Sequence, residues 1–276
     1  MGGAVIGGHD IALSALTVLD APAPVAVDAA AHAGFDSVTF RLTDGVNAQS
    51  YPLVDDAVLR RETLAHLNHH GLGVLDVEVV RLRDGIDVPA LGPVLEVAAA
   101  LGARHLLVIN QSLDEARAAE AFGAICAQAQ PYRLRPVLEF MAFTATRTAE
   151  DALRLVERAG HDGGGVLVDA LHLSRSGGSP AELHSIVQQA PGRFPYAQLC
   201  DAPSAAPQGG RRGLYQEAVE SRLLPGEGKL PLAEMVRALP AGIPLSIETP
   251  VAAIAHLSPQ ARAQRALDAT RRLLGD

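Results

Sequence analysis

The sequence predicts an α/β fold: a closed (β/α)8, or TIM, barrel with a parallel eight-stranded sheet inside and helices outside. Short β-branched or Leu-rich runs alternate along the chain with amphipathic stretches of helical length. Eight such strand–helix units fill 276 residues, which matches the repeat and the size of this barrel. The strand runs are almost continuously apolar, as in a parallel sheet that is covered on its outside. A doubly wound open sheet remains the alternative, because it shows the same alternation.

The individual elements follow from this periodicity. The expected strands are 12–19, 37–42, 73–82, 105–110, 136–141, 165–171, 194–200 and 243–249. The expected helices are 23–33, 55–70, 88–102, 113–130, 148–159, 179–190, 232–239 and 258–274. Gly34 and Gly71 directly follow helical runs, where a left-handed cap favours glycine. Thr148 and Asp151 have the spacing of a helix start related to the capping box. The doublet His69–His70 ends a helix and is interpreted as a solvated C-terminal cap.

We expect residues 1–276 to form a single domain, because no linker or low-complexity tract interrupts the alternation. Only 201–230 breaks the rhythm, with many Pro and Gly residues and no clean period. Loops of this length inside a compact domain are usually functional or mobile. We therefore interpret 201–230 as a lid-like loop after the seventh strand. The alternative is a solvated charged loop.

Composition excludes several classes of function. The chain has 23 Lys and Arg against 31 Asp and Glu, a net charge of −8 and a pI near 5.7, which argues against nucleic acid as a partner. Cys126 and Cys200 cannot form a disulfide framework and are expected to be buried thiols. The chain shows neither a secretory signal nor an apolar run of about 18 residues. We expect a soluble cytoplasmic protein with no membrane partner. Barrels of this size often dimerise, so a homo-oligomer stays open.

Polar side chains interrupt four consecutive apolar strands near their ends, where barrels of this class build active sites. They are Glu139, Asp169, Gln198 and Glu248. A carboxylate inside a buried strand costs several kcal/mol unless it is paired or bound to a cation. An oxygen-rich set of this kind suits a divalent metal, Mn²⁺ or Mg²⁺. The alternative for each residue alone is a satisfied polar group or a carboxylate neutralised by a buried Arg.

The order of these residues resembles the xylose-isomerase-like TIM barrels, the sugar phosphate isomerase/epimerase superfamily. The shared pattern is a Glu at the fifth strand, Asp-x-x-His at the sixth, a polar ligand followed by Asp at the seventh and a Glu at the eighth. The segment LLPGEGKLPL (223–232) is similar to the family's P-G-x-G stretch. The resemblance spans the chain from the first strand to Glu248.

The resemblance implies a metal site made by the residues Glu139, Asp169, Gln198 and Glu248. It also implies that Glu139 and Glu248 move protons. Gln198 departs from the family, which often has His at this place. Return of the proton at the neighbouring carbon by the same carboxylate gives isomerisation, and return from the opposite face gives epimerisation.

Five further residues are expected to contact substrate: His172, Glu78, Arg222, Asp201 and Arg41. His172 follows Asp169 by three residues and could instead be a helix-start His bonded to backbone. Glu78 lies in an apolar strand, at a place where these families often contact a substrate hydroxyl. Arg41 is a partner either for Glu78 or for an anionic substrate. Arg222, just before LLPGEG, is the preferred residue for gripping a phosphate or carboxylate.

Three functions are weighed against one another. The leading hypothesis is a divalent-metal-dependent isomerase or epimerase of a sugar, keto-sugar or polyol derivative, which abstracts a proton next to a carbonyl through a metal-stabilised enediolate. A lyase, either a dehydratase or a β-eliminating deglycosidase, begins with the same proton abstraction. A non-catalytic sugar-binding barrel would keep the pocket without turnover. All three imply a small-molecule carbohydrate as the ligand.

Overall fold

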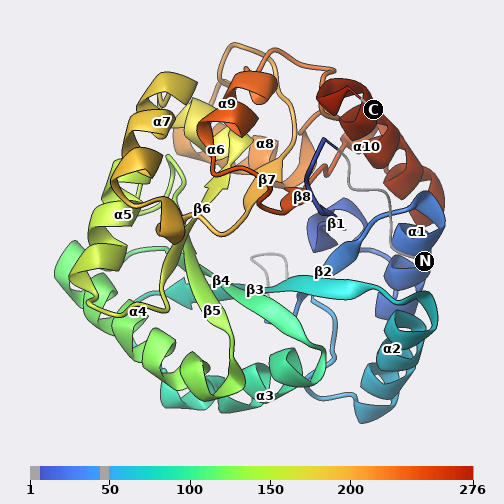
Figure 1. Ribbon diagram of the computed structural model, residues 1–276, viewed down its shortest axis with the longest axis horizontal. Helices are drawn as coiled ribbons and strands as arrows, with labels where there is room; N and C mark the ends of the chain where they lie inside the picture. The colour runs from blue at the N-terminus through green and yellow to red at the C-terminus, as the bar shows by residue number, and fades with distance from the viewer. Residues whose placement is uncertain (1–6, 44–49, 276) are drawn as a thin grey trace.

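The computed structural model describes residues 7–43 and 50–275 and contains the expected closed barrel (Figure 1). Eight parallel strands pair in sequence order, and the last pairs with the first through Ile11–Leu245 and Leu13–Ile247. This closing pair excludes the open-sheet alternative. The helices surround the strands on the outside of the ring (Figure 1).

The strands are β1 (Ile11–Leu13), β2 (Ser37–Arg41), β3 (Gly73–Leu82), β4 (Ala103–Asn110), β5 (Arg135–Glu139), β6 (Gly165–Asp169), β7 (Ala197–Leu199) and β8 (Leu245–Ile247). The helices are α1 (Ala23–Ala33), α2 (Ala57–His70), α3 (Gly92–Ala100), α4 (Glu115–Ala129), α5 (Ala149–Arg158), α6 (Ala170–Arg175), α7 (Pro180–Gln189), α8 (Gly210–Glu220), α9 (Leu232–Ala238) and α10 (Pro259–Leu274).

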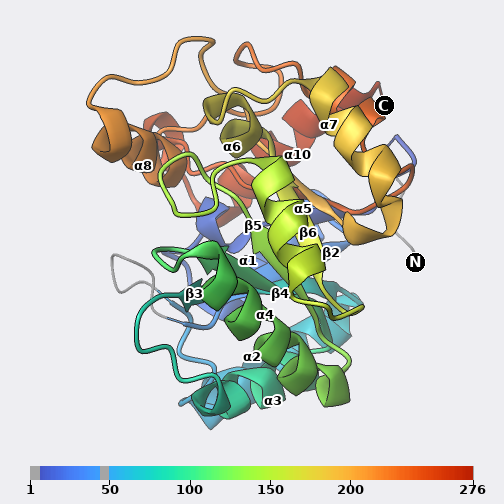
Figure 2. The same ribbon diagram turned by 90° about the vertical axis from the view of Figure 1, so that its left-hand side faces the viewer.

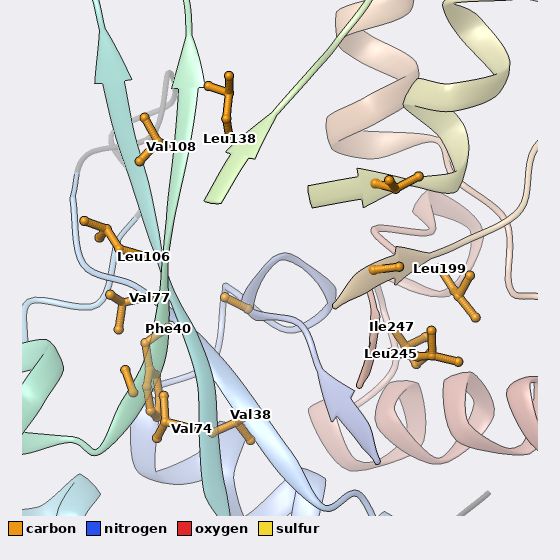
Figure 3. Packing of buried hydrophobic residues seen from close by; sticks show 14 of the residues in the cluster. Val38, Phe40, Val74, Val77, Leu106, Val108, Leu138, Leu199, Leu245 and Ile247 are labelled. Atoms are coloured by element: carbon orange, nitrogen blue, oxygen red, sulfur yellow. The ribbon is translucent and has the colours of Figure 1, made fainter. Parts of the chain in front are cut away.

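Two hydrophobic layers hold this arrangement. The outward-facing side chains of the strands pack against the helices in one large cluster, part of which Figure 3 labels around the ring. A smaller cluster that includes Leu75, Leu107, Val137 and Tyr196 fills the inside of the barrel. The outside of the closed sheet therefore gives the helices the apolar surface on which they bury their own apolar faces. No helix in the described part of the chain is long and apolar enough to cross a membrane.

The local signals for helix ends are confirmed. The Thr148 side chain accepts from the Asp151 amide, and Asp151 accepts from the Thr148 amide, which completes a capping box. Gly34 and Gly71 end α1 and α2 in the left-handed conformation, with φ of 98° and 66°. Both cysteines are buried free thiols.

The structure differs from the expected elements in several places. β7 and β8 have only three residues each, against the expected runs 194–200 and 243–249. β1 ends at Leu13, and a 3-10 turn follows over Ala15–Thr17, because the Thr17 hydroxyl donates to the Ile247 carbonyl and turns the chain. A short helix, α6, starts directly at the end of β6. The segment 201–230, which we expected to be a loop, contains α8.

α8 is fixed to the rest of the barrel at its inner side. Arg175 of α6 donates to both carboxylate oxygens of Glu217, at 2.8 and 2.7 Å, and both side chains are buried. Figure 2 shows α8 beside α6 at the rim. Antiparallel bridges between Asp201 and Leu223 and between Ser221 and Val251 hold the two ends of the segment.

Candidate active site

A cavity of about 510 Å³ lies at the end of the barrel where the strands finish. Six of the residues predicted from the sequence line it: Arg41, Glu78, Glu139, His172, Arg222 and Glu248. Asp169 and Gln198 lie at the same end, in register with each other on β6 and β7. The four-strand set predicted from the sequence is therefore brought together at one mouth of the barrel.

Arg222 joins two members of this set. Its Nη1 lies 2.5 Å from Oδ2 of Asp169, and its Nη2 lies 2.7 Å from Oε2 of Glu248. Its Nε donates to the Ala218 carbonyl of α8 at 2.7 Å. The Arg222 side chain is only 2% exposed. Burial alone would raise the pKa of Asp169, but the Arg222 guanidinium holds it below its ordinary value.

Glu139 has no such cation beside it. His172 Nε2 lies 3.7 Å away, and burial lowers the pKa of His172 to about 4, so the imidazole is neutral at neutral pH. Burial and the Asp169 and Glu248 carboxylates raise the pKa of Glu139 well above its ordinary range. The Arg222 guanidinium acts in the opposite direction but forms no ion pair with Glu139, so it compensates an ionised Glu139 only in part.

Glu248 stands between opposing influences. Burial, reinforced by Glu78 and Asp169, raises the pKa of Glu248 to about 7, while Arg222 acts in the other direction. Its Oε1 accepts from the Ser14 hydroxyl at 3.1 Å and from the Gln198 amide at 3.4 Å.

Gln198 supplies a free acceptor. Its Oε1 is buried and has no hydrogen-bond partner among the described residues. A buried acceptor without a partner costs about 1–3 kcal/mol, so this oxygen is suited to a group that enters the site.

These residues can be tested for their fit to a divalent metal. Of three buried carboxylates, two pair with the Arg222 guanidinium and the third, Glu139, does not, and the amide oxygen of Gln198 has no partner among the described residues. In donor type and charge the set matches a hard cation. The carboxylate oxygens of Glu139, Asp169 and Glu248 do not all lie within 4.8 Å of one another. The donors therefore fit a divalent ion chemically, although they are spread more widely than a closed coordination shell.

The remaining predicted residues divide into two groups. Arg41 and Glu78 form a pair, with Nη2 and Nε of Arg41 at 2.7 and 2.9 Å from Oε1 of Glu78, and both line the cavity. The Asp169 side chain caps α6 by accepting from the His172 amide at 2.9 Å, and His172 lines the cavity. The Arg41–Glu78 pair and the backbone bond of His172 are therefore present, while contact of these residues with a substrate stays a prediction.

Asp201, which we expected to contact substrate, has a different place. Its carboxylate accepts from the backbone amides of Ala202, Gly226 and Leu230, at 2.8 to 3.0 Å. It is not among the residues that line the cavity. Asp201 thus holds the start of the 201–230 segment to its last turn. An Asp directly before a Pro- and Gly-rich run was the available signal for this role, because its carboxylate can accept from nearby backbone amides.

Several cavity residues were not identified as site residues from the sequence, among them Arg81, Phe143 and Tyr215. Arg211 and Arg212 also line the cavity and belong to the segment 201–230, which the sequence predicted to be lid-like. Tyr215 lies on α8, and the missed helix explains its omission. One face of α8 lines the cavity, with the 3–4-residue spacing of a helix, through Tyr215, Ala218 and Val219. Arg222 continues this spacing just after the helix ends.

The chain was compared with known proteins. The profile of a family described as xylose isomerase-like TIM barrel matches residues 27–273. No curated protein sequence matches significantly. The IolI protein with a bound zinc atom is similar in structure, with a TM-score of 0.79 and 17% identity over 96% of this chain and 98% of that one.

Two further solved structures are similar. D-allulose 3-epimerase from Methylomonas sp. in complex with D-allulose has a TM-score of 0.67 and 16% identity, over 99% of each chain. A family 2 AP endonuclease from Brucella melitensis has a TM-score of 0.64 and 18% identity, over 91% of this chain and 98% of that one. At these identities the likeness concerns the fold.

Proposed function

Because the chain belongs to the xylose isomerase-like TIM barrel family, we propose that it is a divalent-metal-dependent isomerase or epimerase of a small carbohydrate or polyol derivative. One observation carries the proposal: two buried glutamates, Glu139 and Glu248, line one cavity. Directly behind Glu248 lies Gln198, which donates to it and whose own amide oxygen has no partner among the described residues. Two solved structures of similar fold, one with a bound zinc atom and one in complex with D-allulose, support the same class of chemistry.

The cavity suits a small polar molecule. Its volume of about 510 Å³ lies in the range of small-ligand pockets. The chain has no Trp and only four Tyr and six Phe, so it offers few platforms for stacking a large glycoside. Charged side chains such as Arg41, Glu78 and Glu139 line the cavity walls next to apolar ones, and the charged groups can bind hydroxyl groups of a ligand.

The residues that would hold the ion are Glu139, Asp169, Gln198 and Glu248. When bound there, a Mn²⁺ or Mg²⁺ ion polarises a substrate carbonyl and so acidifies the adjacent C–H bond. Glu139 takes the proton from that carbon, and Glu139 or Glu248 returns it. Return to the neighbouring carbon by the same group gives an isomer, and return from the other side gives an epimer. Arg222 keeps Asp169 and Glu248 in place.

The charge of the cavity favours a substrate with a phosphate or carboxylate group. Arg41 and Arg222 are paired with acidic side chains. Arg211 and Arg212 also line the cavity and make no ion pair with the described residues. They lie in the first turn of α8, where the positive end of the helix dipole adds to their own positive charge. An anionic group on the substrate compensates both.

The experiment follows proton transfer itself. Purified protein, stripped of metal and reloaded with Mn²⁺ or Mg²⁺, is incubated in deuterated water with phosphorylated, carboxylated and neutral sugars and polyols. We expect deuterium at a carbon next to the carbonyl, and Glu139→Gln should lower turnover by about 10²- to 10⁴-fold. Glu115→Gln is the control and should keep full turnover, because Glu115 is a partly exposed residue of α4 that does not line the cavity.

Three outcomes separate the alternatives. A product that has lost water or a sugar, seen by mass spectrometry, assigns the site to a lyase instead. Thermal stabilisation by a ligand without product or deuterium exchange assigns it to a binding protein. Unchanged activity after removal of the metal, or in Glu139→Gln, contradicts the proposed mechanism.

A further inference from the structure

A second group of candidate metal ligands lies on the outside of the barrel. Asp28 belongs to α1, and His66 and His70 belong to the C-terminal turns of α2. His66 Nδ1 and His70 Nε2 lie 2.8 and 2.9 Å from the same oxygen, Asp28 Oδ1. The two helices pack against each other along the barrel wall (Figure 1).

These three residues form the most compact ligand set in the described part of the chain. One ligand atom from each lies within 4.8 Å of the other two, and no other three His, Cys, Asp or Glu residues among those described gather so closely. Two imidazoles at positions i and i+4 face the same side of a helix, which is how paired histidines on one helix bind zinc.

We propose that Asp28, His66 and His70 form a divalent-metal site with a preference for zinc or copper. Two imidazole nitrogens and one carboxylate oxygen are the ligands that these ions favour. With three protein ligands, a fourth position stays open for water. Around a tetrahedral zinc ion with bonds of about 2.1 Å, ligand atoms are about 3.4 Å apart. The pairs seen here need to widen by about half an ångström, which partly exposed side chains can accommodate.

The surroundings favour a cation at this place. The three side chains are between 21% and 35% exposed, so an ion can reach them. The end of α2 adds the negative potential of a helix C-terminus.

The site is independent of the barrel mouth. α2 starts after the end of β2 and runs back to the start of β3, so its last turns lie toward the opposite end of the barrel. A bound ion would tie α1 to α2 and act on stability rather than on turnover. It differs chemically from the mouth as well, because the set at the mouth consists of oxygen donors and this one contains two nitrogens.

Copper binding distinguishes the two sites. Full-length protein loaded with Cu²⁺ should show superhyperfine coupling to two imidazole nitrogens by electron paramagnetic resonance. The coupling should be lost in His66→Gln/His70→Gln and kept in His69→Gln, a matched control on the adjacent residue. Glu139→Gln should not change it, so failure of the proposed function leaves this result intact.

Zinc stoichiometry gives the second readout. After dialysis against buffered zinc, wild-type protein and His69→Gln should retain one more equivalent than the double variant, with unchanged turnover in all three. Asp28→Asn keeps a hydrogen-bonding amide between the helices and should also lose the equivalent, which covers the case of a poorly folded double variant. Equal zinc content in wild type, the double variant and Asp28→Asn, or nitrogen coupling that persists without His66 and His70, overturns the proposal.

Discussion

Arg222 is the residue whose removal tests the electrostatics of the mouth most directly. Its guanidinium contacts Asp169 at 2.5 Å and Glu248 at 2.7 Å, and all three side chains are 6% exposed or less. Arg222→Met keeps much of the aliphatic length but leaves two buried carboxylates without their cation. Removing one partner of a buried pair costs about 3–5 kcal/mol, so we expect a loss of this size in the free energy of unfolding.

The measurement is a urea titration followed by circular dichroism, in the presence of a chelator. Arg154→Met is the matched control, because Arg154 also contacts two carboxylates, Glu115 and Asp151 at 2.9 and 2.8 Å, but is half exposed. Exposed pairs contribute about 0.2–1 kcal/mol. If the two variants lose the same stability, the buried pair does not have the energetic importance that its geometry indicates.

Added Mg²⁺ extends the test to the proposed metal site. Mg²⁺ prefers oxygen ligands, so it reports on the mouth and avoids the outer histidines. An ion present at 100 times its dissociation constant stabilises the folded state by about 2.7 kcal/mol. Without Arg222 the uncompensated charge is larger, so the gain should be greater in Arg222→Met than in wild type. No gain in either protein contradicts the assignment of the mouth as a metal site.

Three further predictions concern His105 inside the barrel, Gly228 beside Asp201, and Arg175 on α6. His105 stacks on Tyr196 inside the barrel, and burial lowers the pKa of His105 to about 3. Because the folded state disfavours the charged ring, neutral His105 contributes fully to the free energy of unfolding above its unfolded pKa of about 6.5. This contribution falls by about 2 kcal/mol as the pH decreases from 6.5 to 5. His105→Leu should therefore lose less stability than wild type over that pH range, as measured by urea titrations, and parallel curves would contradict this. In Gly228→Ala the new Cβ would meet the Asp201 carboxylate and lie 2.5 Å from the Ala202 carbonyl. We therefore expect the free energy of unfolding, measured by calorimetry, to fall by about 1–3 kcal/mol. Gly192→Ala is the control and should leave stability unchanged, because the space around Gly192 is open. Arg175→Met breaks the buried contact to Glu217 that holds α8 and should raise KM more than it lowers kcat; an unchanged KM would show that α8 does not shape the cavity.

The fold could be predicted because the same apolar alternation occurs eight times. The strand β3 and the helix α1 have the predicted bounds, since their apolar runs end at Gly or at charged residues. The first strand is shorter than predicted because Thr17 hydrogen-bonds across to the end of β8, a contact between residues 230 positions apart. α8 was missed because Gly209, Gly210 and Gly213 conceal its helical period.

The site could be predicted only as far as strand ends allow. Glu139, Asp169, Gln198 and Glu248 are polar interruptions of apolar runs, so their placement at one mouth follows once the sheet closes. That Arg222 bridges two of them depends on the path of the 201–230 segment, which has no period to read. The outer cluster of Asp28, His66 and His70 joins two helices. The sequence doublet His69–His70 therefore predicted only a helix cap.

The ring of strands is uneven, and this divides the site into two walls. β3 and β4 have ten and eight residues, whereas β1, β7 and β8 have three each. Glu78 belongs to the arc of long strands, which has many backbone hydrogen bonds. Gln198 lies in the arc of short strands, and Glu248 directly follows its last strand. Local opening requires least free energy where fewest backbone bonds must break, so amide hydrogens of the short arc should exchange first. Adaptation to a new ligand would then begin on that arc, while the long strands keep the opposite wall fixed.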